Sequence, residues 1–129
     1  MTTSSHSDFT RRVLAEFPEI RAEIEDSDGL LHIEIGVLAE HAQSAKGRAD
    51  WHTYERCMRL IDELFVNPNP RLENAIYVSF LEHLDFNGER GTKAWSLLSP
   101  RLQAGWQQVR EHLKKLGEQA RTKGSQSHR

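Results

Sequence analysis

Apolar residues recur at helical spacing along most of this chain. Between Leu72 and Leu84 they return every four residues, which is the periodicity of one face of an α-helix. The segment from Trp51 to Phe65 carries a second broad apolar face, and Asn67-Pro68-Asn69-Pro70 separates the two. Each proline restricts the preceding asparagine to extended geometry, so the arriving helix must stop there. The pattern predicts an αα-hairpin whose inner faces form the core.

Short polar residues mark where several predicted helices begin. Asn69 can accept amide hydrogen bonds as an N-cap, and Pro70 then occupies the first helical position, where its missing N–H costs nothing. At the start of the last helix, Ser99 and Pro100 are likewise expected to be the N-cap and the first helical residue. The candidate caps of the remaining helices are Ser7 or Asp8, Asp50, and Thr92.

The same pattern divides the rest of the chain. A first helix reaches Pro18, which kinks it or begins a new one, and residues 26–29 form a turn. A second helix covers residues 30–46, in which Gly36 is expected to mark a close helix–helix contact. Residues 87–91 are expected to be a mobile loop. No pair of alternating strands is found, so the fold class is all-α.

We therefore expect a single compact bundle of five to six helices packed as αα-hairpins. The helical domain covers residues 7–120. Residues 1–6 are small and polar, and we expect them to be disordered. Residues 121–129 are a polar tail that we also expect to be disordered.

Composition bounds the cellular setting. The chain has 129 residues, 37% of them hydrophobic and 28% charged, as in one soluble domain. No apolar run approaches the ~20 residues that span a bilayer, and the first residues lack the pattern of a signal peptide. The single cysteine, Cys57, excludes an internal disulfide. These features predict a cytoplasmic protein that does not enter a membrane.

Charge is unevenly distributed along the chain. Residues 1–40 carry a net charge of −6, residues 41–89 carry −3, and residues 90–129 carry +7, within a total of −2. The plainer explanation is that early acidic helices pack beside a basic last helix. The other is that one surface is acidic in order to attract a basic partner. The acids proposed for that surface are Glu19, Glu23, Glu25, Asp26, Asp28 and Glu34.

Catalytic and metal-binding motifs are sparse. Glu82 and Asp85 are helical neighbours that could share a cation beside His83, although a solvated helix end explains them equally simply. Cys57 has no base or orienting group near it in sequence. There is no paired Cys/His spacing, nucleophile elbow or phosphate-binding glycine loop. We expect neither an enzyme nor a cofactor or bound metal.

The basic last helix raises the possibility of nucleic-acid binding. The pI of about 6.4 and the acids of the first half argue against it, and bases near a helix C-terminus complement its dipole. The tryptophans are expected in the core, yet Trp51 at a helix start and Trp95 after a loop are candidate anchors for a protein interface.

One half of the chain resembles a group of small bacterial helical domains. The resemblance covers the pattern L-x-N-A-x-x-V-S-F-L-E and a later L-x-P-x-L. The matching positions are Leu72, Asn74, Ala75, Val78, Ser79, Phe80, Leu81 and Glu82, then Leu98, Pro100, Leu102 and Trp106. These domains are similar to immunity proteins of polymorphic or contact-dependent toxin systems.

The resemblance implies a stoichiometric inhibitor that binds a toxin, most simply a basic toxin domain. From the residues themselves, we expect Trp51 to anchor the complex and the six acids named above to steer it. The alternative is a helical regulator or adaptor, or a phage-encoded inhibitor, that binds another client with the same surface. A third hypothesis, an enzyme built on residues 82–85, predicts a bound metal.

Overall fold

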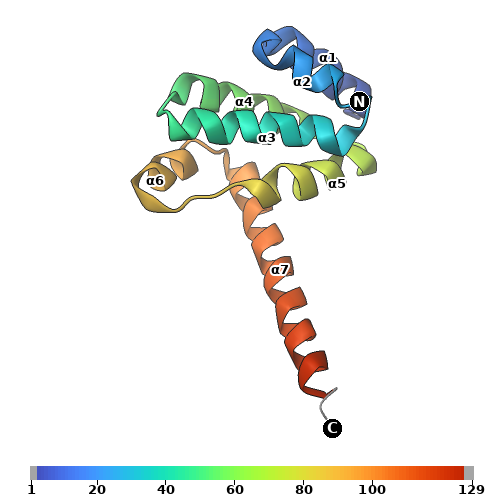
Figure 1. Cartoon of the computed structure of the whole chain (residues 1–129), viewed down its shortest axis with the longest axis vertical. Helices are drawn as coiled ribbons and strands as arrows, with labels where there is room; N and C mark the ends of the chain where they lie inside the picture. The colour runs from blue at the N-terminus through green and yellow to red at the C-terminus, as the bar shows by residue number, and fades with distance from the viewer. Residues whose placement is uncertain (1–2, 127–129) are drawn as a thin grey trace.

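The computed structural model describes residues 3–126, which fold entirely as helices and turns (Figure 1). No described residue belongs to a strand, so the all-α class is confirmed. Among these residues there are seven α-helices instead of the expected five to six. The elements are α1 (His6–Glu16), the 3₁₀ turn η1 (Pro18–Ile20), α2 (Arg21–Glu25), α3 (Leu31–Gly47), α4 (Trp51–Leu64), α5 (Pro70–Ser79), the 3₁₀ turn η2 (Leu81–His83), α6 (Gly88–Ser96) and α7 (Pro100–Gln126).

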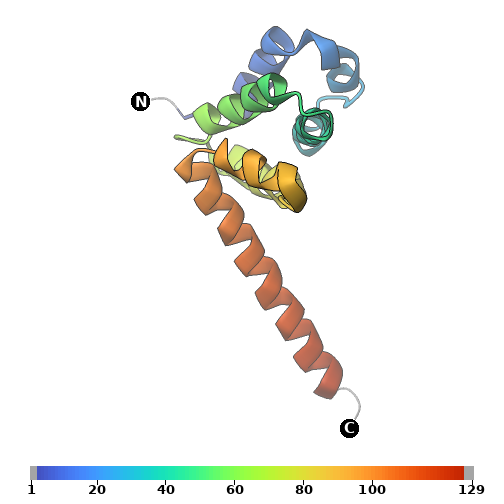
Figure 2. The ribbon, with the colours of Figure 1, turned by 90° about the vertical axis from the view of Figure 1, so that its left-hand side faces the viewer.

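The central element is α3. It contacts α1, α2, α4, α5 and α6. Figures 1 and 2 show α1 and α2 on one side of the α3–α4 pair, α5 and α6 on the other, and α7 extending away from the body. The sequence predicted a central hairpin of α4 and α5, but both helices pack mainly against α3. The hairpin pair is therefore α3 and α4.

The core is continuous and mostly aliphatic. On α3, Leu31, Ile35 and Leu38 are fully or almost fully buried, and they meet buried residues of α1, α4 and α5. Burial of each such side chain contributes about 1.5–3 kcal/mol relative to exposure. Within residues 3–126, no helix has both the length and the apolar character needed to cross a membrane.

Three of the predicted N-caps are confirmed. Asp50 accepts a hydrogen bond from the Thr53 amide at 3.2 Å at the start of α4. Asn69 accepts one from the Leu72 amide at 2.8 Å, with Pro70 in the first turn of α5. At the start of α7, the Ser99 hydroxyl accepts from the Leu102 amide at 3.1 Å. The local chemistry of these residues is sufficient to fix the helix starts.

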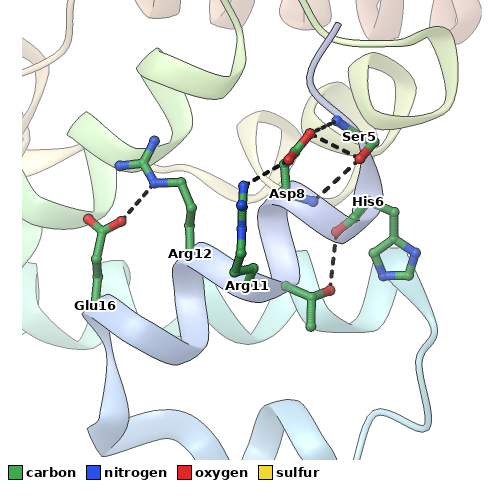
Figure 3. Close-up of polar contacts among 7 residues, drawn as sticks. Ser5, His6, Asp8, Arg11, Arg12 and Glu16 are labelled. Atoms are coloured by element: carbon green, nitrogen blue, oxygen red, sulfur yellow. Dashed lines mark hydrogen bonds and ion pairs between the residues drawn. The ribbon is translucent and has the colours of Figure 1, made fainter. Parts of the chain in front are cut away.

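The first helix begins earlier than predicted. Its cap is Ser5, which forms a capping box with Asp8 (Figure 3). The Ser5 amide and hydroxyl, helped by Arg11, lower the pKa of Asp8. Ser4 donates to the Asn67 carbonyl and accepts from the Asn69 amide, both at 2.8 Å. Residues 4–6 are thus hydrogen-bonded, not disordered as predicted; residues 1–2 lie outside the described range.

The middle of the chain also departs from prediction. The helix predicted from the spacing between Leu72 and Leu84 ends at Ser79, and η2 follows it. The expected mobile loop at residues 87–91 instead opens α6. Phe86 packs edge-on against Trp95 and Trp106, with ring centroids 5.1 and 5.2 Å apart. This aromatic cluster holds the segment in place, and no local sequence signal reports it.

The last helix is longer than predicted. Its backbone remains helical to Gln126, so most of the expected disordered tail is helix; residues 127–129 lie outside the described part. Gly105 of α7 faces Leu81 and Phe65 so closely that a Cβ would lie 2.9 Å from the Leu81 side chain. Gly36 has nothing within 4 Å of the corresponding position, so the predicted close contact there is wrong.

Candidate functional site

The acidic segment forms a short helix and a tight turn on the surface. The amide of Asp26 donates to the Ala22 carbonyl and the hydroxyl of Ser27 donates to the Glu23 carbonyl, which closes the end of α2. Asp28 and Gly29 follow with φ of 54° and 72°. Aspartate and glycine are among the residues that tolerate this left-handed region best. The turn leaves Glu23, Asp26 and Asp28 exposed.

Two of the predicted acids are already paired within the domain. Glu19 lies 3.1 Å from His41 and 3.5 Å from Arg56. Partial burial raises the pKa of Glu19, but hydrogen bonds from its own amide and from His41, with the charge of Arg56, together hold it below its ordinary value. Glu25 pairs with Arg21 at 3.2 Å. In both cases the neighbouring cation partly offsets the negative charge that another protein would encounter.

The remaining exposed acids are uncompensated. Glu23, Asp26 and Asp28 form no ion pair with any side chain that the structure describes. Their field therefore extends into solvent, where water and salt screen it.

Glu34 does not lie on this surface. It is 2% exposed and its carboxylate accepts a 2.6 Å hydrogen bond from Thr10 and lies 3.0 Å from a His6 ring nitrogen. The spacing contains the signal that was missed, because Glu34 lies three residues after Leu31 and four before Leu38, on the buried stripe. Its role in steering is thus a wrong prediction, and it joins α1 to α3 instead.

Two exposed apolar residues follow the acidic turn along the chain. Leu30 and Ile33 are 54% and 50% exposed, and Ile33 opens a groove of about 500 Å³ along α3. The groove passes Gly36 and Val37 and reaches His83 of η2. We call Glu23, Asp26, Asp28, Leu30 and Ile33 the α2–α3 patch. Sequence reasoning missed the apolar pair, although both positions lie off the buried stripe of α3.

Trp51 is remote from this patch. It opens α4, beyond the opposite end of α3 from Leu30 (Figure 1). Its ring packs edge-on against Tyr54 at 5.6 Å, and the Lys93 ammonium lies 5.2 Å from its centroid. The structure does not bring Trp51 together with the acids, so one interface of ordinary size centred on the patch would not include it.

The structure also places the candidate chemical groups. Burial raises the pKa of the Cys57 thiol to about 12, so it stays protonated at neutral pH. A pair not predicted from sequence joins the Ser79 hydroxyl to His32 Nδ1 at 2.8 Å and links α3 to α5. Asp85 accepts from the Asn87 amide. Among the described residues, no group of three or more His, Cys, Asp or Glu could hold a metal ion.

Fold and surface together define a small all-helical domain with exposed acidic and apolar residues where α2 turns into its central helix. A family model described as a domain of unknown function, DUF7674, matches residues 10–114. The chain belongs to that family, since the match extends from the first turns of α1 into the second half of α7. No curated protein and no solved structure matches the chain.

Proposed function

We propose that this protein acts by stoichiometric binding, and that it neutralises a bacterial toxin through the α2–α3 patch. The observation that carries the proposal is that exposed Leu30 and Ile33 directly follow three exposed, unpaired acids along the chain, where α2 turns into α3. Protein interfaces commonly have an apolar centre and a polar rim. A patch of this composition is suited to a macromolecular partner.

The charge of the patch favours a basic partner. Glu23, Asp26 and Asp28 attract a positively charged surface over roughly a Debye length and so accelerate encounter. Leu30 and Ile33 would then be buried on contact, and each contributes about 1.5–3 kcal/mol when fully removed from water. The acids should therefore act mainly on the association rate and the apolar pair mainly on the dissociation rate, so the two effects can be measured separately.

The toxin assignment is supported by the resemblance of residues 72–106 to immunity proteins. An inhibitor of this kind acts in the cytoplasm of the producing cell, where Cys57 would remain reduced. The fold needs no cofactor for such a role, because inhibition requires only that the bound domain covers the toxin's working surface.

The test uses a toxin encoded next to this gene as the purified partner. Association and dissociation rates are measured by biolayer interferometry from 25 to 300 mM salt. A triple variant of the patch acids, E23K/D26K/D28K, should lower the association rate about tenfold or more at low salt and flatten its salt dependence. A double variant, L30A/I33A, should mainly raise the dissociation rate.

The matched control reverses three exposed acids on other helices, E55K/E89K/E111K. It makes the same change in net charge and should leave the association rate within about twofold, because distant charges are screened. If the patch variant and the control variant lower the association rate by the same factor, the partner does not bind at the α2–α3 patch. If the toxin does not bind but another client does so with the same patch dependence, the regulator or adaptor alternative replaces the toxin assignment.

A further inference from the structure

The last helix carries an apolar seam that continues past the domain. Successive apolar residues of α7 are spaced four, three, four and three apart, which is the spacing of a coiled-coil contact face. The first of them, Leu102, is fully buried, whereas Leu116 at the far end is 47% exposed. Figures 1 and 2 both show this half of α7 extending away from the body. The full seam is Leu102, Trp106, Val109, Leu113 and Leu116.

A crevice lies beside the same seam. It has a volume of about 330 Å³ between α5 and α7, and its apolar lining includes Tyr77, Val78, Val109 and Leu113. Val78 of α5 is 44% exposed in it. The molecule therefore presents an apolar crevice and, next to it, a projecting helix with an apolar edge.

These two features are complementary to each other. An interface with twofold symmetry uses the same patch on both subunits, so that patch must contain both the projecting group and its receptor. The α5–α7 face satisfies this requirement, because Leu116 projects from it and the crevice at Val78 is hollowed into it. A helix lying in a groove is also a common mode of protein recognition.

Charges on this face favour a second copy as the occupant. Glu73 and Glu82 of the α5–η2 side make no ion pair with a described side chain. Lys114 and Lys115 on the projecting half of α7 are exposed and make none either. Glu82 therefore lines the crevice, and Lys114 and Lys115 lie on the half of α7 that would fill it.

We infer that two copies of this chain associate through the α5–α7 face, with the projecting half of each α7 lying antiparallel in the other's crevice. Leu116 of each copy packs at Val78 of its counterpart. The lysines of each α7 face the acids beside the opposite crevice. The α2–α3 patch shares no residue with this face, so dimerisation and toxin binding stand or fall separately.

The first test measures molar mass by light scattering and sedimentation velocity for the full chain from 2 to 200 µM. A dimer that dissociates on dilution is expected. L116D and V78D should each weaken it roughly tenfold or more, with unchanged helical circular dichroism. V66D, at a 63% exposed valine outside the face, should leave it intact. A wild-type monomer over the whole range, or a dimer indifferent to both face variants, overturns the inference.

The second test exchanges charges across the interface. E82K and K114E/K115E should each weaken self-association, because each creates like-charged pairs. An equimolar mixture of the two should recover a heterodimer, since the pairs between position 82 of one copy and positions 114 and 115 of the other are then of opposite sign. A simple folding defect would not be repaired by mixing. If no heterodimer forms in the mixture, the antiparallel arrangement is wrong.

Discussion

The hydroxyl of Thr10 donates a 2.6 Å hydrogen bond to the carboxylate of Glu34, which is 2% exposed, so the first helix is held to the central one by a buried polar contact. His6 approaches the same carboxylate oxygen at 3.0 Å. Buried polar groups of this kind are costly to leave without partners. The contact therefore makes Glu34 a structural residue.

Replacing Glu34 with leucine should reduce the free energy of unfolding by about 2–3 kcal/mol, because Thr10 and His6 lose their shared acceptor. Glu34→Gln retains an acceptor oxygen and should cost less. Urea denaturation followed by circular dichroism measures both. Glu23→Leu, at an exposed acid, is the control and should stay within about 0.5 kcal/mol. Equal losses for the leucine and glutamine variants would contradict the assigned role.

Alkaline pH should destabilise the protein through Cys57. Burial raises its pKa to about 12 in the folded chain from an ordinary 9.0, so above pH 9 the unfolded chain ionises first and gains stability. The contribution of the protonated Cys57 thiol to the free energy of unfolding is therefore complete below pH 9. As the pH rises further, this contribution is lost by about 1 kcal/mol per pH unit. Burial of Tyr54 raises its pKa too and adds a loss above pH 10.

The measurement for Cys57 is the free energy of unfolding between pH 8 and 10. Cys57→Ala should lower stability at every pH, because it leaves a small cavity, but its profile should be flatter than that of the wild type. Parallel profiles would show that Cys57 does not titrate on unfolding in this range.

Two helical glycines should respond in opposite ways to alanine. Gly36→Ala should raise the free energy of unfolding by about 0.5–1 kcal/mol, because the position is open and alanine favours helix. Gly91→Ala should be strongly destabilising, since its Cβ would lie 2.0 Å from the backbone carbonyl oxygen of Phe86. Thermal unfolding compares them directly. A stabilising Gly91→Ala would show that Phe86 and α6 separate freely.

The two asparagines of the Asn67-Pro68-Asn69-Pro70 turn should differ. Asn69→Ala removes the side-chain acceptor of the Leu72 amide and should cost about 1 kcal/mol. Asn67 contributes its carbonyl to Ser4, which alanine retains, so Asn67→Ala should have a much smaller effect. Chemical denaturation of both variants measures the two stability losses. A larger loss for Asn67→Ala than for Asn69→Ala would show that Asn69 is not the cap.

The features that could be predicted from the sequence are those that depend on residues close together along the chain. The caps at Asp50, Asn69 and Ser99 depend on residues within three positions of each other, so their chemistry is visible along the chain. The all-α class depends on periodicity and was equally accessible. The central position of α3 could not be predicted in this way, because it depends on which helices pack their apolar faces against each other in the folded chain.

The misplaced features share a dependence on distant contacts. Ser4 is ordered by the backbone of residues 67–69, and Phe86 by Trp95 and Trp106. For the candidate site, the acids of the turn were predicted, but Leu30 and Ile33 were not, since an apolar residue is normally assumed to be buried. Glu34 was misplaced for the converse reason, because a carboxylate is normally assumed to be exposed.

The length of α7 affects how this molecule moves through solvent. Its 27 residues amount to about 40 Å of helix, much of it standing clear of the body (Figure 2). Such an outline experiences more frictional drag than a sphere of equal mass. A single copy should consequently elute early from a gel-filtration column and imitate a larger particle.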